Sequence, residues 1–303
     1  MLSTKTRTSD NAIGRWPGIL QALGVDHRFM RNKHGPCPAC GGKDRYRFDD
    51  KDGRGTWICS HCGSGDGLAL LQHVFGWSFS HAANEVDRII GTVQLGAIVP
   101  ARTEENKIKA LRTVWGESNM VIKGDPVWLY LNRRTGIEVV PADLRFHPAL
   151  KYSDGGTHPA MLAIMRYPDN SGASIHRTYL THDGQKAQVE NAKKLMPGKP
   201  LQTASVRLGP VGRYMGISEG IETALAASRR FHVPVWAATS ATLLEGWAPP
   251  AGAEQILIAG DNDASCTGQA ASFALARRLV REGYAVEVRM PGTKDRDWAD
   301  EDV

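Results

Sequence analysis

The chain has 303 residues, of which 42% are hydrophobic and 23% charged, and its formal net charge at pH 7 is +5. This composition is near the average for globular proteins and excludes wholesale disorder. The length exceeds that of one ordinary compact domain, so two or three domains are expected. The mild positive charge is compatible with a polyanionic partner and equally with none, because the position of the charges matters more than their sum.

The N-terminal residues are polar and lack the apolar core of a secretory signal, and the longest apolar runs, such as residues 160–165, are too short to span a bilayer. These features predict a cytoplasmic protein without membrane contact. In that reducing compartment the five cysteines are expected to be metal ligands or buried thiols rather than disulfides.

The first segment, residues 1–95, contains two cysteine pairs between helical patterns at its two ends. Cys37 and Cys40 are separated by two residues, and Cys59 and Cys62 repeat that spacing after eighteen intervening residues. A C-x₂-C pair points two thiolates at one ion, and two pairs complete the tetrahedral shell of Zn²⁺. Because protein ligands fill all four positions, the ion would stabilise the fold and activate no water. The spacing therefore predicts a structural zinc ribbon.

The residues between the two cysteine pairs predict a small β-hairpin, with strands at residues 44–48 and 56–59, that the ion stabilises. Arginines and rings alternate along the first strand, so the arginines share one face and the rings share the other. Guanidinium groups suit phosphates, and rings can stack on bases. Two alternatives stay open: the rings form the hairpin's own core, and the arginines form a solvated face. The candidate nucleic-acid contacts here are Lys43, Arg45, Tyr46, Arg47 and Trp57.

The second segment, residues 96–211, changes from helical to strand periodicity near residue 144. Asp125 is expected to cap a helix that has Pro126 in its first turn. The segment is therefore expected to be a mixed α+β domain. Its expected elements are a linker at residues 96–103, helices at residues 103–121 and 126–134, and a β-hairpin around a turn at residues 168–172.

The third segment, residues 212–303, alternates strands with helices, which predicts a parallel, doubly wound, Rossmann-like α/β sheet. The whole chain is thus expected to be a multidomain α+β and α/β protein. The helix at residues 269–282 is expected to place Phe273, Ala276, Leu279 and Val280 on one face. The expected strands lie at residues 212–218, 233–239, 255–260 and 285–290, and the other helix at residues 221–231.

Carboxylates follow three of these strands. Glu219 comes after the first strand, Asp261 and Asp263 after the third, and Asp297 and Asp300 after the last. Ligands bind at the carboxyl edge of open α/β sheets, so these side chains are expected to converge there. Carboxylates that converge raise one another's pKa unless a cation compensates, and Mg²⁺ is the natural ion because it prefers hard oxygen ligands.

Two nearby residues are expected to have ordinary roles. Glu222 lies about one helical turn after Glu219 and is expected to face solvent. Cys266 is expected to be a small packed residue rather than a nucleophile. The sequence contains no G-x-x-x-x-G-K-[ST] phosphate loop, so it carries no P-loop nucleotide-binding module.

The order of these motifs resembles the Toprim fold of bacterial-type primases, type IA and type II topoisomerases and some nucleases. Residues 37–70 resemble the zinc ribbon of phage and satellite-phage primase-helicases. The stretches EGIETALA (residues 219–226) and KDRDWAD (residues 294–300) resemble the Toprim version of phage and plasmid primases. The resemblance covers residues 30–90 and 212–302, and looser motifs connect the two parts.

The resemblance implies a DNA primase: a DNA-directed RNA polymerase of the nucleotidyltransferase class that makes short RNA primers on single-stranded DNA from nucleoside triphosphates. It implies that Asp261 and Asp263 hold Mg²⁺ or Mn²⁺, that Asp297 and Asp300 complete the acidic site, and that Glu219 binds metal or acts as general base. The basic residues of the middle segment that would position the triphosphate or template are Arg145, Arg177, Lys186, Lys193 and Lys194.

Two other functions remain open at this point. A Toprim nuclease would use the same metal-binding carboxylates for hydrolysis. A non-catalytic, single-stranded-DNA-binding replication accessory factor would use the zinc ribbon alone, although the intact Glu219, Asp261 and Asp263 argue against it. Related proteins often continue past the acidic motif, whereas this sequence ends at Val303, just after that motif, so a helix that packs onto the sheet edge is expected to be missing or supplied in trans, and its absence would limit activity.

Overall fold

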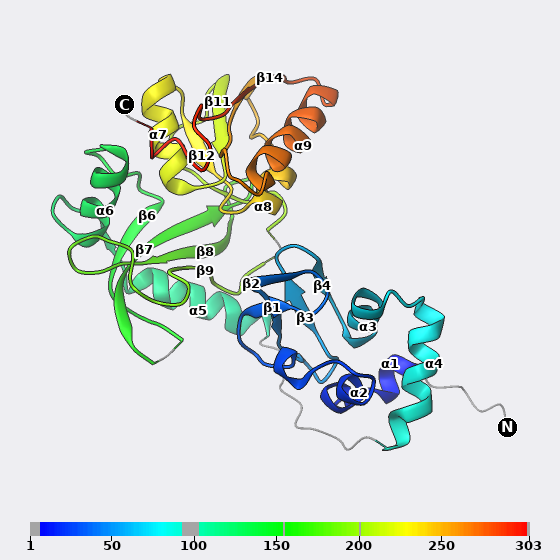
Figure 1. Cartoon of the computed structure of the whole chain (residues 1–303). Coiled ribbons are helices and arrows are strands. Elements are labelled where there is room, and N and C mark those ends of the chain that lie inside the picture. The colour runs from blue at the N-terminus through cyan, green and yellow to red at the C-terminus, as the bar shows by residue number, and fades with distance from the viewer. Residues whose placement is uncertain (1–6, 93–102, 154, 200, 302–303) are drawn as a thin grey trace. The chain divides into compact units, whose positions relative to one another are not determined.

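The computed structural model describes residues 7–92, 103–153, 155–199 and 201–301 (Figure 1). The chain divides into two compact units, Met1–Arg102 and Thr103–Val303. The linker predicted at residues 96–103 falls, apart from Thr103, outside the described residues. In the described parts of both units, no helix is long and apolar enough to cross a membrane.

The first unit contains a four-stranded antiparallel sheet in the order β1-β2-β3-β4. The predicted hairpin is confirmed, because Tyr46, Arg47 and Phe48 pair in register with Cys59, Ile58 and Trp57. The helical patterns at both ends of the segment are confirmed as well. The elements are α1 (Thr8–Asn11), α2 (Trp16–Ala22), β1 (Gly35–Cys37), β2 (Gly41–Phe48), β3 (Trp57–Cys59), β4 (Gly63–Gly65), α3 (Gly67–Phe75) and α4 (Phe79–Ile89), with 3₁₀ turns at His27–Phe29 and Ile90–Thr92.

The core of this unit joins α2, α3 and α4 to one face of the small sheet. The ring of Trp16 lies so close to Gly67 that an added Cβ would be 2.0 Å from it, so only glycine fits at the start of α3. Asp66 caps α3 by accepting a hydrogen bond from the Ala69 amide at 3.0 Å. A tight helix start thus fixes the chain directly after the second cysteine pair.

The second unit is built on one mixed sheet in the order β14-β13-β11-β12-β10-β7-β6-β5, with β8 and β9 added beyond β7. The parallel strands β11 to β14 and the β7–β8 hairpin are confirmed. The short strand β10 connects the two parts, because it pairs with both β7 and β12. The sheet is therefore continuous across residue 212.

The elements of the second unit are α5 (Glu104–Gly116), β5 (Asn119–Met120), α6 (Pro126–Thr135), β6 (Leu144–Lys151), β7 (Thr157–Arg166), β8 (Gly172–Tyr179), β9 (Lys193–Leu195), β10 (Ser205–Val206), β11 (Tyr214–Ser218), α7 (Ile221–Phe231), β12 (Val235–Ala237), α8 (Ala241–Gly246), β13 (Gln255–Ala259), α9 (Thr267–Arg281) and β14 (Ala285–Arg289). As predicted, Asp125 caps α6, accepting a hydrogen bond from the Trp128 amide at 2.8 Å.

Helices cover both faces of this sheet. One core packs α6 and α7 against the strands, and a second core packs α8 and α9 against the opposite face of β11, β12 and β13, as Figure 1 shows for α7 and α9. A third core places α5 against β6, β7 and β8. Because α6 and α7 share a face, residues of the middle segment contact the helix that follows Glu219.

The predicted apolar face of α9 is confirmed for Leu279 and Ala276, which contact the core, and is wrong for Phe273 and Val280. Ala271, Leu275 and Leu279 are buried, whereas Phe273 is 59% and Val280 58% exposed. The buried set recurs at four-residue intervals, which follows one stripe of the helix, and the two large apolar residues lie beside that stripe. Small residues at 271 and 272 allow the helix to approach the sheet closely.

Candidate active site and metal centre

The four paired cysteines converge in the first unit. Their Sγ atoms all lie within 4.8 Å of one another. The distances from Cys37 to Cys62 and from Cys40 to Cys59, 3.9 Å and 3.7 Å, match the ~3.8 Å expected between thiolates that surround one Zn²⁺ at about 2.3 Å. The residues present therefore fit a structural zinc ion.

The basic face of the hairpin is partly neutralised by the protein itself. Arg45 forms a side-chain hydrogen bond with Cys40, and a guanidinium nitrogen of Arg47 lies 3.5 Å from Asp49. Lys43 is exposed on the same strand. Ile58, which the sequence analysis did not select, is 46% exposed and pairs directly with Arg47. This face thus offers cationic groups and one apolar side chain.

The rings of the hairpin form its core. Tyr46 and Trp57 are each 2% exposed and Phe48 is 3% exposed. Trp57 also donates its indole N–H to the carbonyl of Asp66 at 3.0 Å. The prediction that Tyr46 and Trp57 stack on bases is therefore wrong for this structure, because neither ring presents a face to solvent.

The carboxyl ends of β11, β13 and β14 meet at one edge of the second unit's sheet. Ser218 pairs with Ala259, and Ala259 pairs with Arg289, so the three parallel strands end level with one another. The segments that carry the predicted carboxylates leave the sheet from this common edge. The hydrogen bonds between Asn262 and Arg296 and between Asp295 and Asn262 join two of these loops.

Asp261 is the carboxylate with the most strongly raised pKa at this edge. Burial, with repulsion from Glu219 and Asp297, raises its pKa to about 7, although a hydrogen bond with Thr223 acts the other way. Its Oδ1 atom is buried and has no hydrogen-bond partner. Burial and repulsion by Asp263 raise the pKa of Glu219 too. A carboxylate oxygen without a hydrogen-bond partner, next to a second carboxylate with a raised pKa, fits a divalent cation such as Mg²⁺.

Asp263 is held at the start of α9. It accepts hydrogen bonds from the amides of Gly268 at 2.7 Å and Thr267 at 3.2 Å. Burial acts to raise its pKa, but these bonds and one from the Ser265 hydroxyl lower it overall. A Cβ at position 268 would lie 2.9 Å from the Asp263 carboxylate, so glycine is required for this cap. Asp263 is thus ionised and oriented by the helix.

Asp297 and Asp300 share a cation from the middle segment. Arg134 of α6 donates to Asp300 at 2.7 Å, and its other terminal nitrogen is 3.6 Å from Asp297. Burial acts to raise the pKa of Asp300, but Arg134 lowers it overall. The pKa of Asp297 is raised, by burial and by Asp300. Arg134 could not be predicted from the sequence, because no motif spacing connects it to this loop.

The expectation that Glu222 faces solvent is wrong. This residue is 4% exposed, accepts a hydrogen bond from the Tyr130 hydroxyl and pairs with Lys193 at 3.0 Å. Burial acts to raise its pKa, but Lys193 and Tyr130 outweigh it and lower the pKa to about 2. The face of α7 that carries Glu222 packs on α6, which explains why helical position alone gave the wrong answer.

The basic candidates of the middle segment separate into two groups. Lys193 acts electrostatically on Glu219 and Glu222, and burial and Lys193 lower the pKa of Lys186. The other three are engaged locally: Arg145 over the Trp115 ring, Lys194 over the Tyr152 ring, and Arg177 with Tyr179 and the Leu195 carbonyl. Burial lowers the pKa of Arg177. Its predicted nucleic-acid contact is therefore not supported, because its guanidinium is turned to the protein.

Cys266 is exposed at the N-terminus of α9, with a φ of 59°. The expectation of a small packed residue is wrong, because the chain turns sharply between Asp263 and the helix and leaves this side chain outside. The four zinc-ribbon cysteines are, within the described residues, the one group of three or more His, Cys, Asp or Glu side chains placed closely enough to hold a metal ion. Among the described residues, the acidic side chains of the sheet edge do not form such a group.

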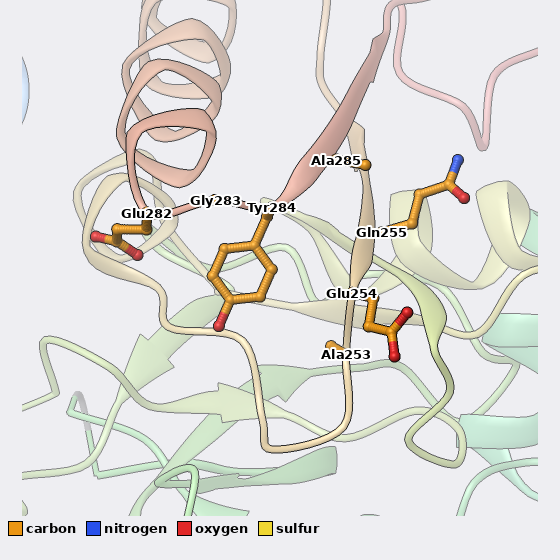
Figure 2. A pocket seen from close by; sticks show the side chains of 7 residues that line it. All are labelled: Ala253, Glu254, Gln255, Glu282, Gly283, Tyr284 and Ala285. Carbon is orange, nitrogen blue, oxygen red and sulfur yellow. The ribbon is translucent and has the colours of Figure 1, made fainter.

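A surface hollow lies at the other end of the same sheet. Ala253, Glu254 and Gln255 line it where β13 begins, and residues 282–285 line it where β14 begins (Figure 2). Because β13 and β14 run in parallel, this hollow is at the edge opposite to Asp261. It therefore takes no part in the acidic site.

Family models match three parts of the chain. Residues 32–68 match the zinc-binding domain of primase-helicase, and residues 214–301 match the Toprim domain. Residues 105–208 match a domain of unknown function, DUF7146. The first two matches fall on the four-cysteine hairpin and on the sheet that carries the carboxylates, which confirms the predicted zinc ribbon and Toprim fold. Together they support a primase-type protein.

Solved primase structures resemble the chain at low identity. The zinc-binding and RNA polymerase domains of the Aquifex aeolicus primase are 13% identical, with 97% of this chain and 81% of that one covered and a TM-score of 0.43. The primase fragment of the bacteriophage T7 primase-helicase protein is 14% identical, with 88% and 92% covered and a TM-score of 0.39. Likeness at this level does not establish a function for this chain.

Proposed function

We propose that this chain is a DNA primase, which synthesises short RNA primers on a single-stranded DNA template by metal-dependent nucleotidyl transfer. The observation that supports this most is the pair Glu219 and Asp261, two half-buried carboxylates at the carboxyl edge of the Toprim sheet whose pKa values are raised by burial and by neighbouring carboxylates. The same chain carries a four-cysteine zinc ribbon that matches the primase-helicase type.

In this proposal Glu219 and Asp261 hold Mg²⁺ or Mn²⁺, with Asp263 and Asp297 flanking them. The ion would neutralise the triphosphate and stabilise charge on the attacking and leaving oxygens. Asp263 stays ionised because α9 caps it. In the alternative role, Glu219 leaves the ion to Asp261 and Asp263 and accepts the proton of the attacking 3′-hydroxyl as general base, for which its raised pKa suits it.

The substrates would contact two basic surfaces. Lys186 and Lys193 influence the carboxylates electrostatically, so they are the candidates for the nucleoside triphosphate. Lys43, Arg45 and Arg47 would contact phosphates of the template without selecting sequence. Because the sequence has no P-loop, a separate replicative helicase is the expected partner for unwinding.

The test is a priming assay on the full chain with Mg²⁺ or Mn²⁺, labelled ribonucleotides and single-stranded DNA. Short RNA should form, and Asp261→Ala should abolish it. Glu245→Ala, which removes an exposed carboxylate on α8, is the matched control and should leave synthesis unchanged. Degradation of the template without synthesis would instead select a Toprim nuclease. Template binding with neither reaction would select a non-catalytic accessory factor.

A further inference from the structure

Helix α6 directs two polar side chains, one turn apart, at the acidic residues of the Toprim segment. Tyr130 donates to Glu222, and Arg134 donates to Asp300 at 2.7 Å. Residues four apart share a helix face, so both contacts are made by the same side of α6. The helix therefore supplies positive charge and a hydroxyl to a region where carboxylates would otherwise repel one another.

The guanidinium of Arg134 is only partly used. One terminal nitrogen, Nη1, donates a short hydrogen bond to Asp300. The other, Nη2, lies 3.6 Å from the Asp297 carboxylate, which is beyond hydrogen-bond length. Its Nε atom is buried without a hydrogen-bond partner. The side chain is 33% exposed. Arg134 is thus anchored on one carboxylate and balances the second by charge alone.

The carboxylates of the edge accordingly differ in how they are balanced. Asp300 has Arg134, Glu222 has Lys193, and Asp263 has the amides of α9. Asp261 has an unpartnered oxygen. Asp297 lies between these cases, because it accepts a hydrogen bond from the Ala299 amide at 2.7 Å, and Arg134 is near it without bonding to it.

We propose that Arg134 is a positioning residue that serves as the resident counter-cation of the acidic edge. It holds the loop of residues 295–300 through Asp300 and competes with a divalent cation for Asp297. The inference rests on the proposed function, since it concerns the same metal-binding edge. Its consequence is that the free protein binds one divalent ion readily at Glu219 and Asp261 and a second one only weakly, because that ion must approach Arg134.

The test is a titration of the zinc-loaded full chain with Mn²⁺, without template or nucleotide. Electron paramagnetic resonance measures the concentration of free Mn²⁺ at each step and so gives the binding isotherm. Mn²⁺ does not replace zinc at four thiolates, so the ribbon stays loaded. Arg134→Gln should strengthen the weak site about tenfold, the order expected when one unit charge near a half-buried ion is removed. Arg134→Lys should stay close to the parent protein. Arg133→Gln is the control, since Arg133 donates to the carbonyls of Asp183 and Gly184, and it should change nothing.

A folded Arg134→Gln protein with an unchanged or weakened Mn²⁺ isotherm would overturn the inference. Asp297→Asn provides a check that does not depend on the folding of that variant: it should remove the weak site and keep the strong one. Retention of both sites in Asp297→Asn would also overturn the inference. If the priming assay fails while these isotherms behave as expected, the proposed function fails and the role of Arg134 stands. If primers form while the Arg134→Gln isotherm is unchanged, the proposed function stands and the role of Arg134 fails.

Discussion

The zinc ribbon and the acidic edge are both metal-ligand sets, but the chain builds them in different ways. The four cysteines lie within 26 positions of sequence, counted from Cys37 to Cys62, and their sulfur atoms already lie within 4.8 Å of one another. The carboxylates come from three loops between Glu219 and Asp300. Several of them already pair with cationic side chains or backbone amides of the protein, without an ion.

This difference has an energetic meaning. Four thiolates without an ion have no other favourable arrangement, so the ribbon depends on zinc. The acidic edge is supported by Arg134, Lys193 and the amides of α9, so its fold is expected to exist without metal. The first site needs its ion to fold, whereas the second is expected to keep its fold whether or not an ion is bound.

The largest effect should follow from zinc removal. Stripping zinc with a chelator, or Cys59→Ser, should unfold residues 7–92, because binding of structural zinc contributes on the order of 10 kcal/mol to the folding of small domains. The second unit should keep its own cooperative transition. Limited proteolysis and the fluorescence of Trp16 and Trp57, both buried, report the loss. A protease-resistant first unit in zinc-free protein would contradict this.

Glu222→Ala should destabilise the second unit by about 3 kcal/mol at pH 7, the lower end for breaking a buried pair, because Lys193 can still reach solvent. Glu222→Gln, which keeps a partner for Tyr130, should cost less. The folded pKa of about 2 lies below the ordinary 4.5. The stabilisation is therefore complete above pH 4.5 and is lost as the pH falls towards 2. Chemical denaturation of both variants against pH measures it; a pH-independent difference from the parent would refute the assignment.

Asp261→Asn should change the stability of the second unit in the opposite direction to Glu222→Ala. The folded pKa of about 7 lies above the ordinary 3.8. Stability linked to this group is thus complete below pH 3.8 and is lost as the pH rises through 7. Without metal at pH 7.5, the variant should be more stable than the parent by about 1–2 kcal/mol, a discounted figure for a mostly buried group. Adding Mg²⁺ should stabilise the parent alone. Thermal melts with and without Mg²⁺ give the answer, and a destabilised Asp261→Asn would reject the metal-site assignment.

The sequence predicted most of the fold, the zinc ribbon and the sheet edge at which the carboxylate-bearing segments meet. Cysteine spacing is local, so it needs no tertiary information. The acidic edge could be located because parallel strands place their carboxyl ends together. The partners of the carboxylates could not be predicted: Tyr130 and Arg134 reach them only because α6 packs beside α7. The same limit explains Glu222 and the rings of the hairpin, since a pattern of two alternating faces does not say which face is covered.

The basic face of the hairpin should contribute moderately to the affinity for single-stranded DNA. Arg45→Ala with Arg47→Ala should weaken binding to single-stranded DNA about tenfold and reduce the slope of log affinity against log salt by about 1.4, that is, about 0.7 for each phosphate that an arginine no longer neutralises. Fluorescence anisotropy across a salt series measures both. Because Arg45 bonds to Cys40, zinc content must be checked alongside. Arg28→Ala, an exposed arginine of the same unit, is the control. An unchanged salt slope in a zinc-loaded double variant would remove the proposed template contact.

The smallest change in stability and affinity is expected from a substitution on the opposite, buried face of β2. The hydroxyl of Tyr46 is buried and has no hydrogen-bond partner, and the ring is core rather than surface. Tyr46→Phe should therefore change stability by no more than about 0.5 kcal/mol, or raise it, because an unsatisfied buried polar group is removed. Template affinity should not change, since the ring cannot reach a base. Denaturant melts and the anisotropy assay test both statements. A loss of affinity in Tyr46→Phe at full zinc content would mean that the ring leaves the core to meet the template, and the separation of the hairpin into a buried face and a binding face would then fail.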